Sequence, residues 1–210
     1  MKKKIIDSLI TIGAVKFGEF RLKSGTLSPI YVDLRIIVSY PRLLTDIAAA
    51  LFELTRGLGY DRIAGIPYTA LPIATAFSLS FGTPMIYARK ERKAYGTGRQ
   101  IEGIWKRGDR ILLIDDLVTN GISKGEAIGV FEQVGLAVED IAILIDREQG
   151  GRERLEKANY RLHSLISIFE ILDRIKSLNK IDGHLYNTVS RFLRDHRHKD
   201  HTQIDTGEPH

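Results

Sequence analysis

Residues 111–126 of the chain read Ile111-Leu-Leu-Ile-Asp115-Asp116-Leu-Val-Thr119-Asn-Gly121-Ile-Ser123-Lys-Gly-Glu126. The apolar run predicts a buried strand that ends in two carboxylates, and the polar turn after it predicts the start of a helix. Ser123 and Glu126 have the spacing of a capping box at that start. A turn of this kind directs backbone N–H groups and the positive end of a helix at one point, where a phosphate binds. The stretch therefore predicts a phosphate site with acids beside it.

A purely structural interpretation of the same residues is that Asp115 and Asp116 only end a strand and Ser123 only caps a helix. Two adjacent carboxylates at the end of a buried strand repel each other, so we favour a ligand site. A ligand that carries a phosphate together with sugar hydroxyls or Mg²⁺ suits both parts of this site. The turn binds the phosphate, and the acids bind the hydroxyls or the metal ion. Other phosphate motifs fail, because the sequence has no G-x-x-x-x-G-K-[ST] and residues 96–101 lack the third glycine of a dinucleotide fingerprint.

Short apolar runs alternate with helical patterns on both sides of this stretch. Strands are predicted at residues 62–66, 85–88, 111–114, 141–145 and 162–168, and helices near 70–79 and 124–134. Continuous apolar strands that alternate with helices indicate an α/β fold with a parallel sheet covered on both faces. In such sheets ligands bind at the carboxyl ends of the strands.

The two ends of the chain add helices. We expect a helix at 5–16, a loop at 17–29, an extended segment at 30–38 and a helix from Pro41 to about residue 57, followed much later by closing helices at 169–178 and 185–194, the last capped by Asp182. Residues 195–210 have one aliphatic side chain and four of the six histidines, so we expect a disordered tail after a single domain at 1–194. The tail histidines His196, His198 and His201 could chelate a metal, but a solvated end is the favoured interpretation.

Composition excludes several classes of protein. The 210 residues include no cysteine, so disulfides, thiolate catalysis and cysteine zinc sites are ruled out. The longest apolar run, residues 47–52, is far shorter than the ~18 residues that span a bilayer, so we expect a cytoplasmic protein with no membrane partner. The net charge is +5, and residues 89–99 hold five cations against one acid. This clustering favours a local anion site over a nucleic-acid-binding face.

Five segments together resemble a known family. Residues 113–123 resemble the phosphoribosyl pyrophosphate (PRPP) signature of type I phosphoribosyltransferases. Four more segments narrow the resemblance to orotate phosphoribosyltransferase, in the form found in the transferase half of bifunctional UMP synthase; they are residues 17–33, 65–72, 89–96 and 146–151. The order and spacing match over roughly residues 5 to 194, and no decarboxylase half is expected.

The resemblance implies the type I phosphoribosyltransferase fold, mainly a parallel sheet covered by helices with a small N-terminal hood. It implies transfer of the phosphoribosyl group from PRPP to orotate, giving orotidine 5′-monophosphate and pyrophosphate in pyrimidine (UMP) biosynthesis. Mg²⁺ is the implied cofactor and enters with PRPP, with Asp115 and Asp116 as the acids that could contact it. A homodimer is also implied, with the loop at 89–99 shared between subunits.

Site residues follow from the same resemblance. The catalytic residues are Lys93, Asp115 and Asp116. Those that bind PRPP are Tyr68, Thr69, Arg89, Lys90, Lys93, Tyr95, Asp115, Asp116, Leu117, Val118, Thr119, Asn120, Gly121, Ile122 and Ser123. Those that bind orotate are Lys23, Tyr31, Val32, Thr119 and Arg147. A guanidinium can meet the orotate carboxylate with two parallel hydrogen bonds, which makes Arg147 a chemically suitable clamp.

Alternatives remain open for both residues and function. Arg147 could instead form a surface salt bridge with Glu148 or Glu153, and Lys23 and Tyr31 could be a solvated lysine and a core aromatic. Ile122 stands where many family members carry Gly, Ser or Thr, and Thr69 and Tyr95 replace a lysine and a histidine of the short bacterial enzymes. The alternative functions are transfer to another nucleobase and, in a different class, a non-catalytic PRPP-sensing regulator of nucleic acid, for which residues 1–60 supply no DNA-binding motif.

Overall fold

The computed structural model describes residues 1–22, 25–89 and 100–197. Its central sheet has the strand order β5-β4-β3-β6-β7-β8. The strands are β3 (Arg62–Gly65), β4 (Met85–Ala88), β5 (Ile101–Glu102), β6 (Arg110–Val118), β7 (Ala137–Asp146) and β8 (Arg161–Ser167). Every neighbouring pair is parallel except β4 and β5, which are antiparallel. The predicted parallel sheet is confirmed, and its five parallel strands end at the same edge.

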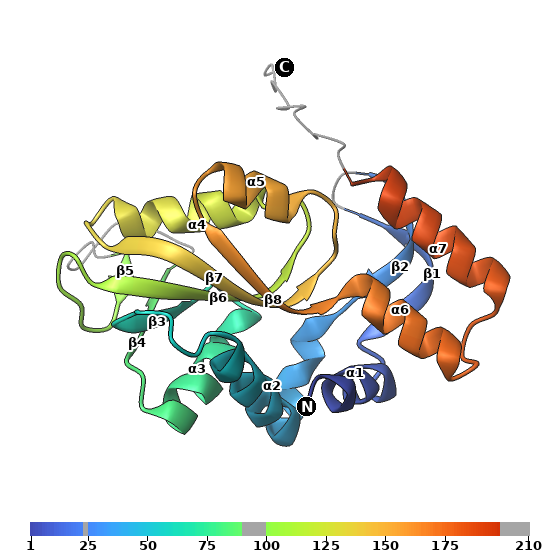
Figure 1. Cartoon of the computed structure of the whole chain (residues 1–210), viewed down its shortest axis with the longest axis horizontal. Coiled ribbons are helices and arrows are strands. Elements are labelled where there is room, and N and C mark those ends of the chain that lie inside the picture. Colours follow the sequence, from blue (N-terminus) through green and yellow to red (C-terminus); the bar gives the residue numbers. More distant parts are fainter. Residues whose placement is uncertain (23–24, 90–99, 198–210) are drawn as a thin grey trace, which may run out of the picture.

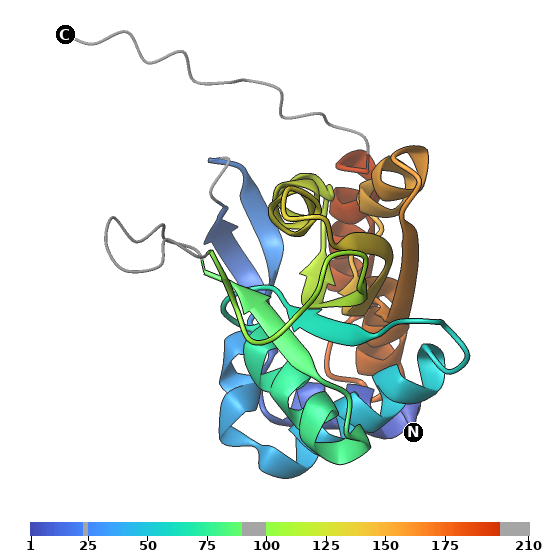
Figure 2. The same cartoon turned by 90° about the vertical axis from the view of Figure 1, so that its left-hand side faces the viewer.

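Helices cover both faces of this sheet (Figures 1 and 2). On one face lie α2 (Pro41–Leu54) and α3 (Ala70–Phe81), and on the other lie α4 (Ile122–Glu132) and α5 (Gly151–Lys157). Strand β6 shows why its sequence is continuously apolar. Leu112 and Ile114 belong to the core under α2 and α3, whereas Ile111 and Leu113 belong to the core under α4 and α5.

The N-terminal part differs from the sequence prediction. A hairpin of β1 (Val15–Arg21) and β2 (Leu27–Val32) occupies the predicted loop at 17–29. The predicted extended segment at 30–38 is wrong beyond Val32, because residues Leu34–Ser39 form a 3₁₀ helix. The Asp33 side chain accepts from the Arg35 N–H and so caps this helix. The apolar residues of this hairpin do not alternate regularly and are interrupted by glycines, so their periodicity does not indicate two strands.

The first and last helices complete the part of the structure around the hairpin. They are α1 (Lys2–Thr11), α6 (Ile168–Ser177) and α7 (Gly183–Asp195). Figure 1 shows α7 beside β1 and β2, with α1 and α6 below. The Asp182 cap is confirmed, since its Oδ1 accepts from Leu185 N at 2.7 Å. Among the described residues, no helix is long and apolar enough to cross a membrane.

The start of the predicted tail continues from α7. The ring of His196 lies 4.2 Å from that of Phe192, and Arg197 pairs with Glu153. His198, His201 and the rest of the tail lie outside the described residues.

Candidate active site

The turn between β6 and α4 is the centre of the site. Gly121 adopts a left-handed φ of +76° and is the N-cap of α4, which begins at Ile122. The predicted capping box is wrong: Ser123 lies inside the first turn, no side chain caps the helix, and both Ser123 and Glu126 are exposed. The Asn120 side chain accepts from Ile122 N at 3.3 Å and so shapes the turn. The predicted strand, turn and helix start are otherwise present. Two of the first N–H groups of the helix are already bonded, Ile122 N to Asn120 and Lys124 N to the Gly121 carbonyl, and in the described residues Ser123 N has no such bond and can donate to an anion.

The start of helix α5 packs against this turn, a contact that the sequence analysis did not predict. A Cβ on Gly151 would lie 2.7 Å from the Thr119 carbonyl oxygen and 2.5 Å from a methyl of Val118. A Cβ on Gly121 would in turn lie 3.1 Å from the Gly151 carbonyl oxygen. The two backbones therefore pack without room for side chains, and the only local signal in the sequence was the pair of glycines at 150 and 151.

The family resemblance implies that this turn binds PRPP, so we expect Gly151→Ala to weaken that binding, because the added methyl group must displace the turn at Thr119. Overpacking of this kind typically costs about 1–3 kcal/mol, so the Michaelis constant for PRPP should rise on the order of tenfold. Steady-state kinetics with varied PRPP measure this rise. Gly125→Ala is the matched control, because a Cβ there meets nothing within 4 Å and alanine suits a helix. Equal kinetics for both variants would show that the close packing does not matter.

The two acids at the end of β6 have different surroundings. Asp115 is 3% exposed and forms an ion pair with Lys124, which is itself buried in the first turn of α4. Burial raises the pKa of Asp115 to about 7; Lys124 opposes this shift and the neighbouring Asp116 adds to it. Asp116 is only half-buried, and its Oδ1 accepts from Leu117 N at 2.8 Å. Asp116 is thus the more accessible of the two acids, and contact of either with ribose stays a prediction.

The buried pair gives a prediction for stability against pH. The unfolded pKa of an aspartate is about 3.9, so burial of Asp115 makes unfolding easier as pH rises from about 4 to about 7. Lys124→Met removes the cation that lowers this pKa. In the variant, the free energy of unfolding therefore keeps falling above pH 7, at about 1.4 kcal/mol per pH unit. In urea unfolding, the free energy of unfolding of Lys124→Met should be lower than that of the wild type at pH 8.5 but not at pH 6. A deficit of equal size at both pH values, or one shared by Lys157→Met on the surface, would contradict this account.

Arg147 follows β7 and is the strongest feature of the site. It is 7% exposed, its backbone N–H donates to the Val118 carbonyl at 3.0 Å, and Nε and Nη2 have no hydrogen-bond partner in the described residues. Burial lowers the pKa of this guanidinium. The surface salt bridge considered from sequence is wrong, because Glu148 binds Ser167 and Glu153 binds Arg197. A buried cation with free donors is well suited to bind an anionic ligand that accepts from them.

Gln149, two residues further on, was missed by sequence analysis. It is 7% exposed, and its buried Oε1 has no hydrogen-bond partner among the described residues. A glutamine in a loop after a strand gives no signal in sequence, because glutamine is common on solvated loops.

The segment between β3 and α3 lies next to the two acids. Ile66 N donates to the Ile114 carbonyl at 3.0 Å, which joins the ends of β3 and β6. Tyr68 follows with 64% exposure, Thr69 is partly exposed, and the Pro67–Tyr68 peptide bond is cis. The structure therefore brings Tyr68 and Thr69, which the resemblance assigns to PRPP binding, to the same edge of the sheet as Asp115.

The remaining predicted residues make contacts of their own or lie outside the described ranges. Tyr31 stacks on Phe20, with ring centroids 5.3 Å apart, and its hydroxyl accepts from Arg35 at 3.0 Å. Val32 is 8% exposed and belongs to the core, and Arg89 forms an ion pair with Glu102. The described ranges do not include Lys23, Lys90, Lys93 and Tyr95.

The described part of the chain provides few ligands for Mg²⁺ by itself. Within the described ranges no group of three or more histidine, aspartate or glutamate side chains converges on one point. Asp115 is already paired with Lys124, which leaves Asp116 as the accessible carboxylate. This arrangement fits a Mg²⁺ that keeps most of its ligands from substrate oxygens and water, as this ion usually does at phosphate sites.

The turn after β6, the adjacent acids and the mainly parallel sheet all lie within residues 35–176, which match the family model described as "Phosphoribosyl transferase domain". The chain is therefore a phosphoribosyltransferase. The chain is 38% identical over 175 residues to orotate phosphoribosyltransferase of Pyrococcus abyssi, a match that covers 82% of this chain and 96% of that protein. The chain belongs to the orotate phosphoribosyltransferase family.

Longer proteins are similar as well. Uridine 5′-monophosphate synthase of Bos taurus is 41% identical over 193 residues, covering 91% of this chain and 40% of that protein. The structure of Leishmania donovani UMP synthase superposes with a TM-score of 0.84 at 40% identity, covering 91% of this chain and 42% of that one. The chain thus spans about two-fifths of the length of these synthases.

Proposed function

We propose that the chain transfers the phosphoribosyl group of PRPP to orotate and releases pyrophosphate. The observation that carries this proposal is the buried guanidinium of Arg147, whose Nε and Nη2 lack partners, beside the turn that begins at Val118. Orotate carries a carboxylate and uracil does not, so a buried cation favours the acidic base. The name of the Pyrococcus abyssi relative, which this chain matches over 96% of that protein's length, supports the same substrate.

The proposed chemistry separates opposite charges along the substrate. As the bond at the ribose C1 breaks, positive charge builds on the sugar and negative charge builds on the departing pyrophosphate. Asp116 faces the sugar in this proposal, and the N–H groups at the start of α4 hold the 5′-phosphate. Mg²⁺, held by Asp116 and substrate oxygens, would neutralise charge on the pyrophosphate. The family resemblance further supports a homodimer that shares the loop at 89–99, of which residues 90–99 lie outside the described ranges.

One assay separates this function from its alternatives. The protein with PRPP and Mg²⁺ is mixed with orotate, uracil or hypoxanthine, and the loss of base absorbance is followed, with PRPP omitted in the control. We expect orotate alone to be consumed. Turnover of uracil or hypoxanthine without orotate would assign another base. PRPP binding with no turnover of any base would favour the non-catalytic regulator.

A further inference from the structure

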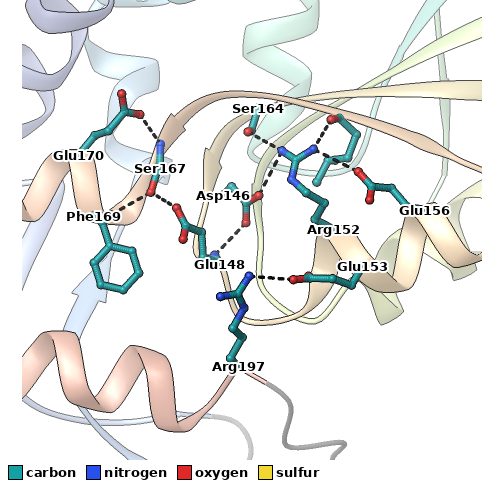
Figure 3. Close-up of polar contacts among 11 residues, drawn as sticks. Asp146, Glu148, Arg152, Glu153, Glu156, Ser164, Ser167, Phe169, Glu170 and Arg197 are labelled. Atoms are coloured by element: carbon teal, nitrogen blue, oxygen red, sulfur yellow. Dashed lines mark hydrogen bonds and ion pairs between the residues drawn. The ribbon is translucent and has the colours of Figure 1, made fainter.

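A polar network lies next to the segment that carries Arg147 (Figure 3). Its members are Asp146, Glu148, Arg152, Ser164 and Ser167, and they line a cavity of about 220 Å³ between the ends of β7 and β8 and the start of α5. Apart from Glu148, which was considered as a salt-bridge partner of Arg147, none of these side chains was assigned a role from the sequence, and none has a part in the proposed chemistry. The network flanks Arg147 on both sides along the chain, since Asp146 precedes it and Glu148 follows it.

Asp146 and Arg152 fix the first side of the segment. The Oδ1 of Asp146 accepts from Glu148 N at 2.8 Å, and its Oδ2 forms an ion pair with Arg152 Nη2 at 3.3 Å. Arg152 in turn donates to Ser164 Oγ at 2.8 Å and to the Leu162 carbonyl at 2.7 Å, both on β8. The chain around Arg147 is thereby held to the neighbouring strand by side chains as well as by the sheet.

Glu148 fixes the second side. Its φ is +54°, an uncommon value for a residue with a Cβ, and its Oε1 accepts from Ser167 Oγ. Ser167 is held in place by hydrogen bonds, because it is the N-cap of α6 and takes part in a complete capping box with Glu170. A loop residue in a strained conformation is therefore anchored to the end of a helix by a single carboxylate.

Arg147 lies between these two anchored residues, and its own Nε and Nη2 contact no acceptor in the described residues that could orient them. We propose that Glu148 is a positioning residue that, through its bond to Ser167, holds the guanidinium of Arg147 toward the carboxylate of the base. The inference rests on the proposed function for the identity of that base. Displacement of a binding group by about 1 Å can cost on the order of a hundredfold, so the effect is measurable.

The kinetic test compares three variants. Glu148→Ala should raise the Michaelis constant for orotate about fivefold to twentyfold and leave that for PRPP unchanged. Glu148→Gln keeps an acceptor for the Ser167 hydroxyl and should restore most of the affinity. Glu153→Ala is the matched control, because Glu153 lines the same cavity and is bound to Arg197 rather than to this segment. Equal changes in both Michaelis constants for Glu148→Ala would indicate a general structural role and overturn the inference.

A double-mutant cycle tests whether Glu148 acts through Arg147. In an Arg147→Met background, Glu148→Ala should have no further effect on orotate, because the group that it positions is gone. Additive effects of the two substitutions would overturn the inference.

A spectroscopic readout separates this inference from the proposed function. The ¹⁵N–¹H signal of Arg147 Nε, assigned by its loss in Arg147→Met, should be sharp in the wild type and in Glu153→Ala and broadened or shifted in Glu148→Ala. A wild-type chain that does not consume orotate refutes the function, whereas an Nε signal unchanged in Glu148→Ala refutes the positioning role.

Discussion

Asp116→Asn is expected to lower kcat about a hundredfold to a thousandfold while the melting temperature changes little. The carboxylate is half-buried at the carboxyl end of β6. Its proposed partner is a sugar that becomes positively charged, and loss of one such electrostatic contact typically has an effect of this size. Initial rates at saturating PRPP and orotate, together with thermal melting, measure the two quantities separately.

The control for this variant is another aspartate on the adjacent strand. Asp140 lies at the opposite end of β7, buried and bound to Arg161 and His163. Asp140→Asn should lower the melting temperature and leave specific activity intact. The reverse result, with Asp116→Asn melting early but fully active, would make Asp116 a structural residue.

Arg147→Met is expected to raise the Michaelis constant for orotate about tenfold to a hundredfold and leave that for PRPP nearly unchanged. The charged hydrogen bonds that it would lose are worth about 1.5–3 kcal/mol. The same variant should melt higher by about 2–4 °C, the shift that ~1 kcal/mol produces in a chain of this size. The reason is that methionine fills the space of a buried cation whose Nε and Nη2 have no partner in the described residues.

Arg161→Met separates this pattern from a general effect of losing an arginine. Arg161 is exposed and bound to Asp140 and Glu139, at the amino end of β8. Its substitution should lower stability and leave both Michaelis constants unchanged. If Arg147→Met affects both substrates equally, Arg147 organises the whole site instead of binding the base.

Sequence patterns predicted the sheet well because its strands are buried on both faces. Residues 111–114 and 141–145 are continuously apolar for that reason, and each was placed within a few residues of its observed bounds. The hairpin at 15–32 was missed because its burial alternates irregularly around a break in register between Phe17 and Phe20. Helix α5 was missed because a helix of seven residues is too short for its hydrophobic period to be detected.

Only those parts of the site whose residue types by themselves indicate a chemical role could be predicted. The acids and the glycine-containing turn were found from the pattern, and Arg147 was found from the family resemblance. The burial of Asp115 against Lys124 was not predictable, because a lysine in the first turn of a helix is usually solvated. Contacts between distant segments, such as Glu148 with Ser167, leave no local pattern at all.

The contact between the turn at 118–121 and the segment at 147–151 has a consequence for exchanging parts between relatives. Arg147 N binds the Val118 carbonyl, and Gly151 leaves no space beside Thr119 and Gly121. A chimera that imports either segment alone places two unmatched backbones against each other. Any redesign of base preference in this scaffold must therefore exchange both segments together. In a library that varies only residues near Arg147, most variants will have a turn at 118–121 that no longer packs against the segment at 147–151.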